Sequence, residues 1–137
     1  MTTRSVTVER EMPFPPEKVW RALTTPHLIA EWLMKNDFAP VVGHGFTLTG
    51  DWGGVECQVR AVDPPRVLSY TWDHPSEEPA YDLRSVVTFT LEPTATGTLI
   101  RMEQAGFRPD QPQAYGGAMH GWQEHLANLE KAIARLA

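Results

Sequence analysis

The fold is decided by the stretch Gly116-Gly117-Ala118-Met119-His120-Gly121-Trp122-Gln123-Glu124-His125-Leu126, which continues to Ala137. Its apolar residues follow one another at steps of three and four: Met119, Trp122, Leu126, Leu129, Ile133 and Leu136. This spacing predicts a helix with one apolar stripe along its whole length. About 20 residues at about 1.5 Å each give a rod of roughly 30 Å, the width of a small domain. We therefore expect this helix to cover the apolar face of a sheet.

Alternating apolar and polar residues predict strands in most of the preceding chain. The first strand runs from Ser5 to Met12, and two short helices around 16–24 and 26–33 follow it. The later strands are expected to turn these residues inward: Phe46 and Leu48; Val55, Cys57, Val59 and Ala61; Leu68, Tyr70 and Trp72; Val87, Phe89 and Leu91; Ile100, Met102 and Gln104. Short turns join these strands, so consecutive strands are most simply antiparallel neighbours.

The order of these elements predicts an α+β fold. A sheet with one apolar face must cover it, and only the last helix is long enough to do so. We expect a curved antiparallel sheet wrapped around a long C-terminal helix, with two short helices after the first strand. The pattern shows no internal repeat or linker, which predicts one domain over residues 1–137.

The connections between the predicted strands differ in length. In an antiparallel meander, alternate connections lie at the same end of the sheet. The tip around Trp52 and the loops Asp73–Ala80 and Phe107–Ala114 should therefore share one end, and the turns Asp63–Arg66 and Pro93–Gly97 the other. Long loops often carry function. The sequence thus predicts a mouth beside the first half of the last helix.

Charge and composition exclude several kinds of partner. The net charge is −5 and the sequence has no basic run, which argues against nucleic acid and anionic membranes. There is neither a signal-peptide pattern nor a run of about 20 apolar residues, so we expect a cytoplasmic protein. Cys57 is the only cysteine, and His120 and His125 point about 140° apart on a helix. We therefore expect no metal site and no cofactor.

Several short motifs follow one another in a specific order over almost the whole chain. They are Phe14–Thr24, Glu31-Trp32, Val42–Phe46, Val62–Leu68, Gly97-Thr98, Gly106-Phe107 and His120–Trp122. In order and spacing they resemble the START-like helix-grip proteins, the SRPBCC superfamily, and within it the bacterial homologues of the activator of heat-shock-protein-90 ATPase. The resemblance implies a cavity between sheet and helix that binds apolar small molecules. Members also include cyclases, dehydratases and co-chaperone domains, so the fold does not by itself give the function.

The sequence departs from this family at one position of chemical interest. Many relatives have a histidine on the last strand, two residues before the glycine that matches Gly106. This sequence has Gln104 in that place. The resemblance therefore implies no catalytic base at this position here.

The predicted mouth defines the candidate ligand-binding residues. Trp72 and Trp122 lie on inward faces near it, and a cavity needs large apolar walls with a few polar groups. Core packing is an equal alternative for both, while Trp52 either caps the cavity or lies exposed. His125 is the best candidate for a polar contact inside the cavity, and a hydrogen-bonded histidine on the flank of the helix is the alternative. The full set of candidates is Phe46, Trp52, Tyr70, Trp72, Phe89, Met102, Gln104, Met119, Trp122 and His125.

Three functions remain open from the sequence. The first is binding of a small hydrophobic molecule, aromatic or acyl in character. The second is interaction with a chaperone ATPase, and the third is a cyclase or dehydratase activity in the same cavity. The expected inward polar residues are few: Arg10, Ser69, Ser85, Gln104 and His125. They include no paired carboxylates and no Ser-His-Asp arrangement, which favours binding over catalysis. Dimers occur among similar proteins, so a homodimer is a further candidate assembly.

Overall fold

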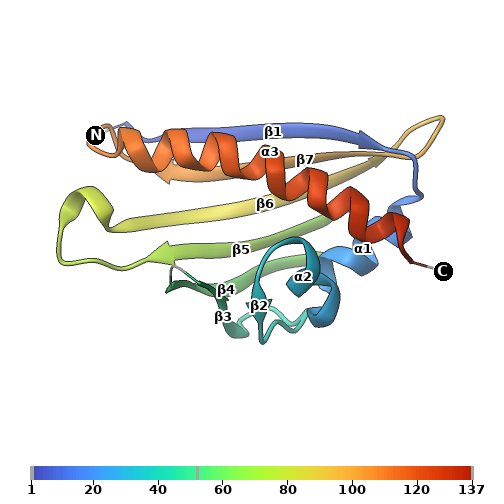
Figure 1. Cartoon of the computed structure of the whole chain (residues 1–137), viewed down its shortest axis with the longest axis horizontal. Coiled ribbons are helices and arrows are strands. Elements are labelled where there is room, and N and C mark those ends of the chain that lie inside the picture. The colour runs from blue at the N-terminus through green and yellow to red at the C-terminus, as the bar shows by residue number, and fades with distance from the viewer. Residues whose placement is uncertain (1, 52, 137) are drawn as a thin grey trace.

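A computed structural model describes residues 2–51 and 53–136 of the chain, so the predicted contact at Trp52 lies outside the described residues. Figure 1 shows a long helix lying across one face of a sheet, with two short helices at one end of it. The elements are β1 (Arg4–Met12), α1 (Pro16–Thr24), α2 (Pro26–Trp32), β2 (Lys35–Asn36), β3 (Gly45–Gly50), β4 (Gly53–Asp63), β5 (Val67–His74), the 3-10 helix η1 (Pro79–Tyr81), β6 (Leu83–Pro93), β7 (Thr98–Phe107) and α3 (Pro112–Ala134).

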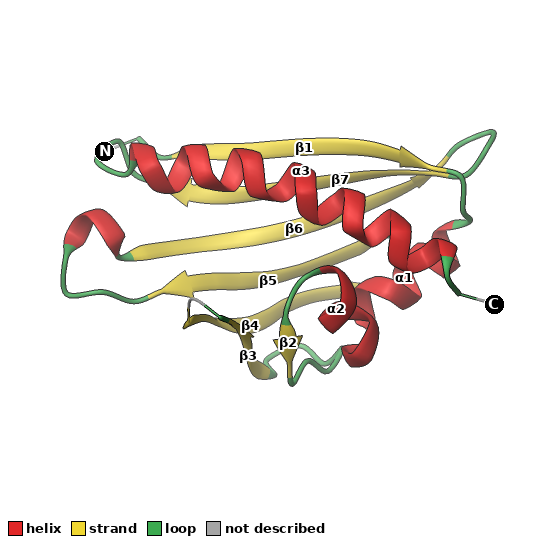
Figure 2. Ribbon diagram, viewed as in Figure 1, coloured by secondary structure: helices red, strands yellow, loops and turns green. Residues whose placement is uncertain are grey.

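The described strands form one antiparallel sheet in the order β1-β7-β6-β5-β4-β3-β2. The first and last long strands are thus neighbours, and the remaining strands follow as a meander. The predicted α+β fold is confirmed, including the two short helices after β1 (Figure 2). The loop containing η1 and the connection from β7 to α3 lie at one end, while the β6–β7 turn lies at the other (Figure 1). The first two connections therefore share one end of the sheet, as the prediction of a mouth requires (Figure 1).

The alternation of β4 is interrupted by a bulge at Arg60. Val59 pairs with Tyr70, but the next paired residue, Ala61, stands opposite Ser69. Beyond the bulge, the side chains of β4 point to the opposite faces from those that strict alternation predicts, so that Val62 packs against the core. The prediction that Ala61 faces inward is therefore wrong, because a period of two residues carries no information about an inserted one.

Helix α3 begins at Pro112, one turn before the stretch from which it was predicted. Proline suits the first turn of a helix, where its missing N–H costs no hydrogen bond. The predicted stripe is confirmed in its centre, since Trp122, Leu126, Leu129 and Ile133 are buried. Only residues 108–111 then separate β7 from α3, so the long loop predicted as Phe107–Ala114 is wrong at its C-terminal end.

The second half of α3 packs against the short helices and closes one end of the core. Trp32 of α2 is buried there, and its indole Nε1 donates a hydrogen bond to the Ala22 carbonyl at 2.9 Å. Its ring meets Phe89 edge-on, with ring centroids 6.1 Å apart. Trp20 is half-buried and also packs against the core. Both tryptophans thus belong to the packing that closes this end of the core.

Candidate ligand-binding site

A cavity of about 550 Å³ lies under the first half of α3. Volumes of roughly 300–1,000 Å³ are typical of small-molecule sites. The helix supplies one wall, and strands β4 to β7 supply the floor through Val55, Trp72, Leu83 and Gln104. The residues after α2 and the 3-10 helix η1 complete the rim. No Asp, Glu, Lys or Arg lines the cavity in the described part of the chain.

Small residues form the helix wall of the cavity. Ala114, Gly117, Ala118 and Gly121 lie on one face of α3, at steps of three, one and three. A Cβ atom added at Gly117 or Gly121 would meet nothing within 4 Å. Glycine inside a helix costs roughly 0.5–1 kcal/mol relative to alanine. The helix thus keeps space open at some expense of its own stability.

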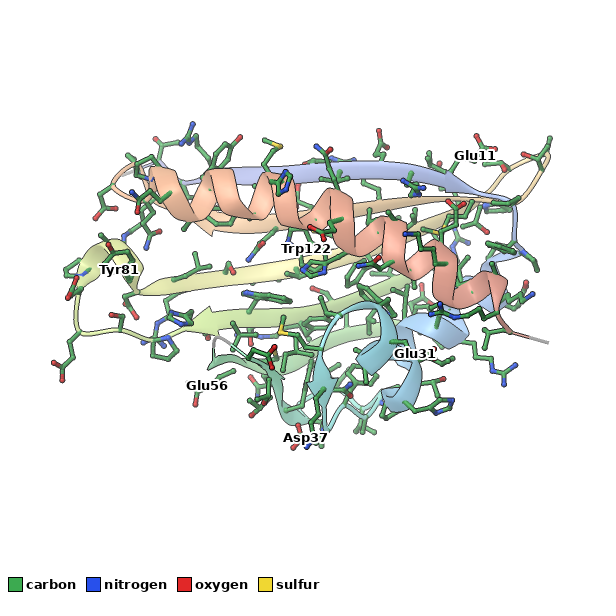
Figure 3. All side chains as sticks on the ribbon, viewed as in Figure 1. Glu11, Glu31, Asp37, Glu56, Tyr81 and Trp122 are labelled. Atoms are coloured by element: carbon green, nitrogen blue, oxygen red, sulfur yellow. The ribbon has the colours of Figure 1, made fainter. Side chains whose placement is uncertain are left out.

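Two tryptophans form the aromatic part of the cavity. The rings of Trp72 on β5 and Trp122 on α3 have centroids 5.3 Å apart and planes tilted by 59°. Behind them, Phe89 meets Trp122 in a T-shaped contact at 5.8 Å. Figure 3 shows Trp122 beneath α3, over the sheet. The aromatic wall therefore joins helix and sheet at the inner end of the cavity.

A chain of hydrogen bonds crosses the cavity wall behind these rings. Trp122 Nε1 donates to Gln104 Oε1 at 2.7 Å, and Gln104 Nε2 donates to Ser85 Oγ at 3.0 Å. Ser85 Oγ donates in turn to the backbone carbonyl of Trp72 at 2.6 Å. The side chains of Trp122, Gln104 and Ser85 are buried, and Trp72, which contributes its backbone carbonyl, is partly buried. We refer to Trp122, Gln104, Ser85 and Trp72 as the polar relay.

His125 stands at the side of the cavity next to Trp122. The two ring centroids are 5.4 Å apart. Burial lowers the pKa of His125, while Glu124 and a hydrogen bond with the Trp32 backbone oppose the shift. Since its ordinary pKa is 6.5, the imidazole is uncharged at neutral pH.

Gln111, just before α3, ties the rim of the cavity together. It is only 2% exposed, and its Nε2 donates to the carbonyls of Asp82 at 2.8 Å and Pro79 at 3.3 Å. Its Oε1 accepts from the backbone N–H of Arg108, whose guanidinium also binds the Pro79 carbonyl. These contacts hold η1, and with it the rim residue Tyr81, against the start of α3. No pattern in the sequence identifies Gln111, because only the tertiary fold brings its partners near.

The family model described as "Activator of Hsp90 ATPase homolog 1-like protein" matches residues 13–134. The chain belongs to this family. The resemblance inferred from the short motifs is thereby confirmed. No protein of curated function matches the chain.

Solved structures with the same fold include several bacterial proteins. Protein MLL2253 from Mesorhizobium loti is 60% identical, with a TM-score of 0.95 over 98% of this chain and 99% of that one. Protein BH1534 from Bacillus halodurans is 28% identical, with a TM-score of 0.82 over 97% and 99%. The Aha1 dimer from Colwellia psychrerythraea is 21% identical, with a TM-score of 0.81 over 95% and 96%. The last comparison shows a shared fold, in a homologue that is a dimer.

The structure brings only part of the predicted ligand-binding residues to the cavity. Trp72, Gln104, Trp122 and His125 line it. Met119 is half-buried against the core and does not line the cavity. The remaining described candidates lie in the buried aromatic and apolar core: Phe46, Tyr70, Phe89 and Met102.

One polar residue expected to face the core lies on the outer face of the sheet instead. Ser69 lies on the outer face of the sheet, where its hydroxyl and that of Thr88 are 3.1 Å apart. The prediction that Ser69 faces inward is wrong, because its neighbours Leu68 and Tyr70 occupy the inner face of β5.

The described residues form neither a metal site nor a reactive thiol. No group of three His, Cys, Asp or Glu residues among them could hold a metal ion. Cys57 is buried, and burial together with Asp73, Asp37 and Glu56 raises the pKa of its thiol to about 12. The thiol is therefore protonated and a poor nucleophile. None of the described helices is long and apolar enough to cross a membrane.

Proposed function

We propose that the protein binds a small, largely apolar molecule in the cavity under α3. The observation that carries this proposal is the run of small residues on α3, which leaves open a cavity that Trp72 and Trp122 also line. A core that only needed to be packed would have larger side chains at Gly117 and Gly121, because filled cores are more stable. The volume and the mainly apolar lining suit an aromatic or acyl molecule.

Catalysis in the same cavity is the less favoured reading. A cyclase or dehydratase needs an acid and a base that face each other across the substrate. His125 and His74 are the titratable imidazoles of the lining, and no carboxylate of the described chain joins them there. Gln104 cannot exchange a proton in place of a base. These features support binding rather than turnover.

Interaction with a chaperone ATPase is proposed from the family description alone. A docking face would be expected to expose a continuous apolar patch. The outer face of the sheet is instead polar along β6 and β7, where Arg84 and the pair Thr88–Glu103 share the face with Val86, which is 36% exposed. A homodimer like that of the Colwellia homologue is a proposal of the same kind. The cavity carries more of the argument than either surface.

Fluorescence titration tests the binding proposal directly. Neutral aromatic and acyl compounds bound in the cavity should quench or shift the tryptophan emission, because Trp72 and Trp122 line it. Gly121→Leu places a side chain in the cavity and should weaken binding by at least about tenfold, the effect of roughly 1.4 kcal/mol. Gly116→Leu is the matched control, since Gly116 is an exposed glycine of the same helix outside the cavity lining.

Two further variants assign the fluorescence signal. Trp72→Phe and Trp122→Phe should each reduce the response to ligand, whereas Trp32→Phe at the closed end should preserve it. Unchanged emission with every compound of the panel would contradict the proposal. Equal affinities of Gly121→Leu and Gly116→Leu would contradict it as well.

A further inference from the structure

In the described chain, no Asp, Glu, Lys or Arg side chain lines the cavity to pair with an ionic ligand. The polar side chains of the described lining are amides, a phenol and two histidines, Gln104, Gln113, Tyr81, His74 and His125. A carboxylate or ammonium group moved from water into such a site loses hydration without gaining an opposite charge. His125 does not substitute for a cation, because burial favours its neutral form. The lining therefore disfavours ions of either sign.

The polar relay fixes the orientation of the Gln104 amide. An indole N–H can only donate, so the atom that faces Trp122 Nε1 must be the amide oxygen. The amide nitrogen then faces Ser85, whose hydroxyl hydrogen is already donated to the Trp72 carbonyl. Ser85 Oγ consequently accepts from Gln104. The direction of every hydrogen bond in the relay is determined by the chemistry of its two ends.

This arrangement leaves one hydrogen-bond donor at the cavity wall. An amide nitrogen has two hydrogens, and Ser85 accepts one of them. Within the described chain, the second hydrogen has no acceptor. Gln104 is 1% exposed, and its sheet neighbours at the same level are the apolar Val6 and Val87. A buried N–H without an acceptor is unfavourable, so a ligand that supplies the acceptor gains what the protein lacks.

We propose that the cavity selects an uncharged amphiphilic molecule, whose apolar body lies against Trp72 and Trp122 and whose carbonyl or ether oxygen accepts the free N–H of Gln104. The inference rests on the proposed binding function and adds the class of ligand and the residue that selects it. Gln104 then acts as a specificity determinant. The aromatic pair supplies contact area, while the amide distinguishes an oxygen-bearing molecule from a hydrocarbon of the same size.

Three probes of similar size test the selection. They are 2-ethylnaphthalene, which has no acceptor, 2-acetylnaphthalene, which has a neutral carbonyl, and 2-naphthoate, which is an anion. Titrations are followed by the indole N–H signals in proton–nitrogen correlation spectra, assigned with Trp→Phe variants. The ketone should bind about tenfold tighter than the hydrocarbon and at least about tenfold tighter than the anion. The Trp122 signal should move, whereas that of Trp32, bound to the Ala22 carbonyl, should stay.

Variants at the amide locate the donor. Gln104→Met keeps the length of the side chain without its N–H groups, so the ketone and the hydrocarbon should bind equally. Gln113→Met, a second glutamine of the cavity rim, is the matched control and should keep the preference. Ser85→Ala provides a variant that leaves the amide in place, and it should also keep the preference. Loss of the preference in Ser85→Ala would contradict the selection by the amide. This variant therefore keeps the proposal testable if loss of the Trp122 acceptor impairs folding of Gln104→Met.

The possible outcomes separate this inference from the binding proposal. Equal binding of ketone and hydrocarbon by the wild type, or tightest binding of the anion, overturns the selection by Gln104 and leaves the binding function standing. An undiminished preference in a folded Gln104→Met variant has the same meaning. Failure of all three probes to bind overturns both proposals. The predicted order in the wild type, abolished in Gln104→Met and kept in Gln113→Met, supports both.

Discussion

The glycines of this protein serve two different physical needs. At Gly106 the backbone has a φ of +125°, and an added Cβ would lie 2.5 Å from the Arg84 carbonyl oxygen. The irregularity there, opposite the start of β1, returns Phe107 to the interior. In α3 the reverse holds, because a Cβ at Gly116 or Gly121 would meet nothing within 4 Å. The first position requires glycine for its backbone, and the helix positions do not.

A pair of alanine substitutions separates these two needs. Gly106→Ala should destabilise the protein by about 2 kcal/mol or more, because it combines an unfavourable φ with a clash against backbone. Gly116→Ala should stabilise it by about 0.5–1 kcal/mol, because alanine is the better helix former and the site is open. Urea unfolding of both variants measures the difference. A neutral Gly106→Ala or a destabilising Gly116→Ala would contradict this account.

Single residues also show how far the pattern of the sequence could predict the site. Alternation predicts the inner face of the sheet for Tyr70, Trp72, Phe89 and Gln104, and the structure confirms that face for each. Only Trp72 and Gln104 reach the cavity. Alternation identifies the face of a residue, but not how far the helix stands from that point of the strand.

At the scale of elements, the rim of the cavity depends on a contact between two loops. Gln111 connects the start of α3 with the loop that contains η1, through two carbonyl groups at positions 79 and 82. Arg108 adds a third contact to the same loop. Because the loop has few other hydrogen bonds to the body of the protein, we expect Gln111 to control its opening.

Limited proteolysis measures this opening. Gln111→Ala removes both side-chain donors and should lower the free energy of unfolding by about 1 kcal/mol. Cleavage by a Glu-specific protease after Glu77 should accelerate, because the loop must leave the rim to be cut. Gln113→Ala, at an exposed position in the first turn of α3, is the control and should be cleaved like the wild type. Equal rates for the two variants would show that Gln111 does not hold the loop.

At the scale of the whole molecule, His125 links α3, the end of α2 and the cavity, so its protonation affects global stability. Its pKa is lowered in the folded state, chiefly by burial, relative to an ordinary value of 6.5. The unfolded chain therefore binds a proton first as the pH falls. Stability should decrease on acidification from about pH 6.5 down to the folded pKa.

Asp82 acts in a separate, more acidic range. A hydrogen bond from the Ser76 backbone N–H, helped by Arg84, lowers the pKa of this carboxyl from 3.8. Its contribution to stability is present above pH 3.8 and is lost as the pH falls through the folded value. The interval above pH 5 thus isolates the histidine from this carboxyl.

Urea unfolding at pH 7.5, 6.5 and 5.5 tests the role of His125. The wild type should lose stability over this interval, and His125→Asn should lose less of it, whatever its stability at pH 7.5. His120→Asn, an exposed position of the same helix, should follow the wild-type slope. If His125→Asn and wild type have parallel pH profiles, burial of the neutral imidazole contributes nothing to acid sensitivity.

The sequence by itself determined the faces of most strand residues, the apolar stripe of α3, the order of the elements and the end at which the long connections meet. These features follow from local periodicity and from chain connectivity, which a sequence records directly. Only the tertiary structure decided the bulge at Arg60, the contacts of Gln111, the polar relay and the cavity. A cavity is the distance left between two elements, and that distance depends on the summed volumes of side chains from both. Here small residues at 117 and 121 of α3 stand opposite Trp72 on β5, a combination that no single stretch of sequence contains.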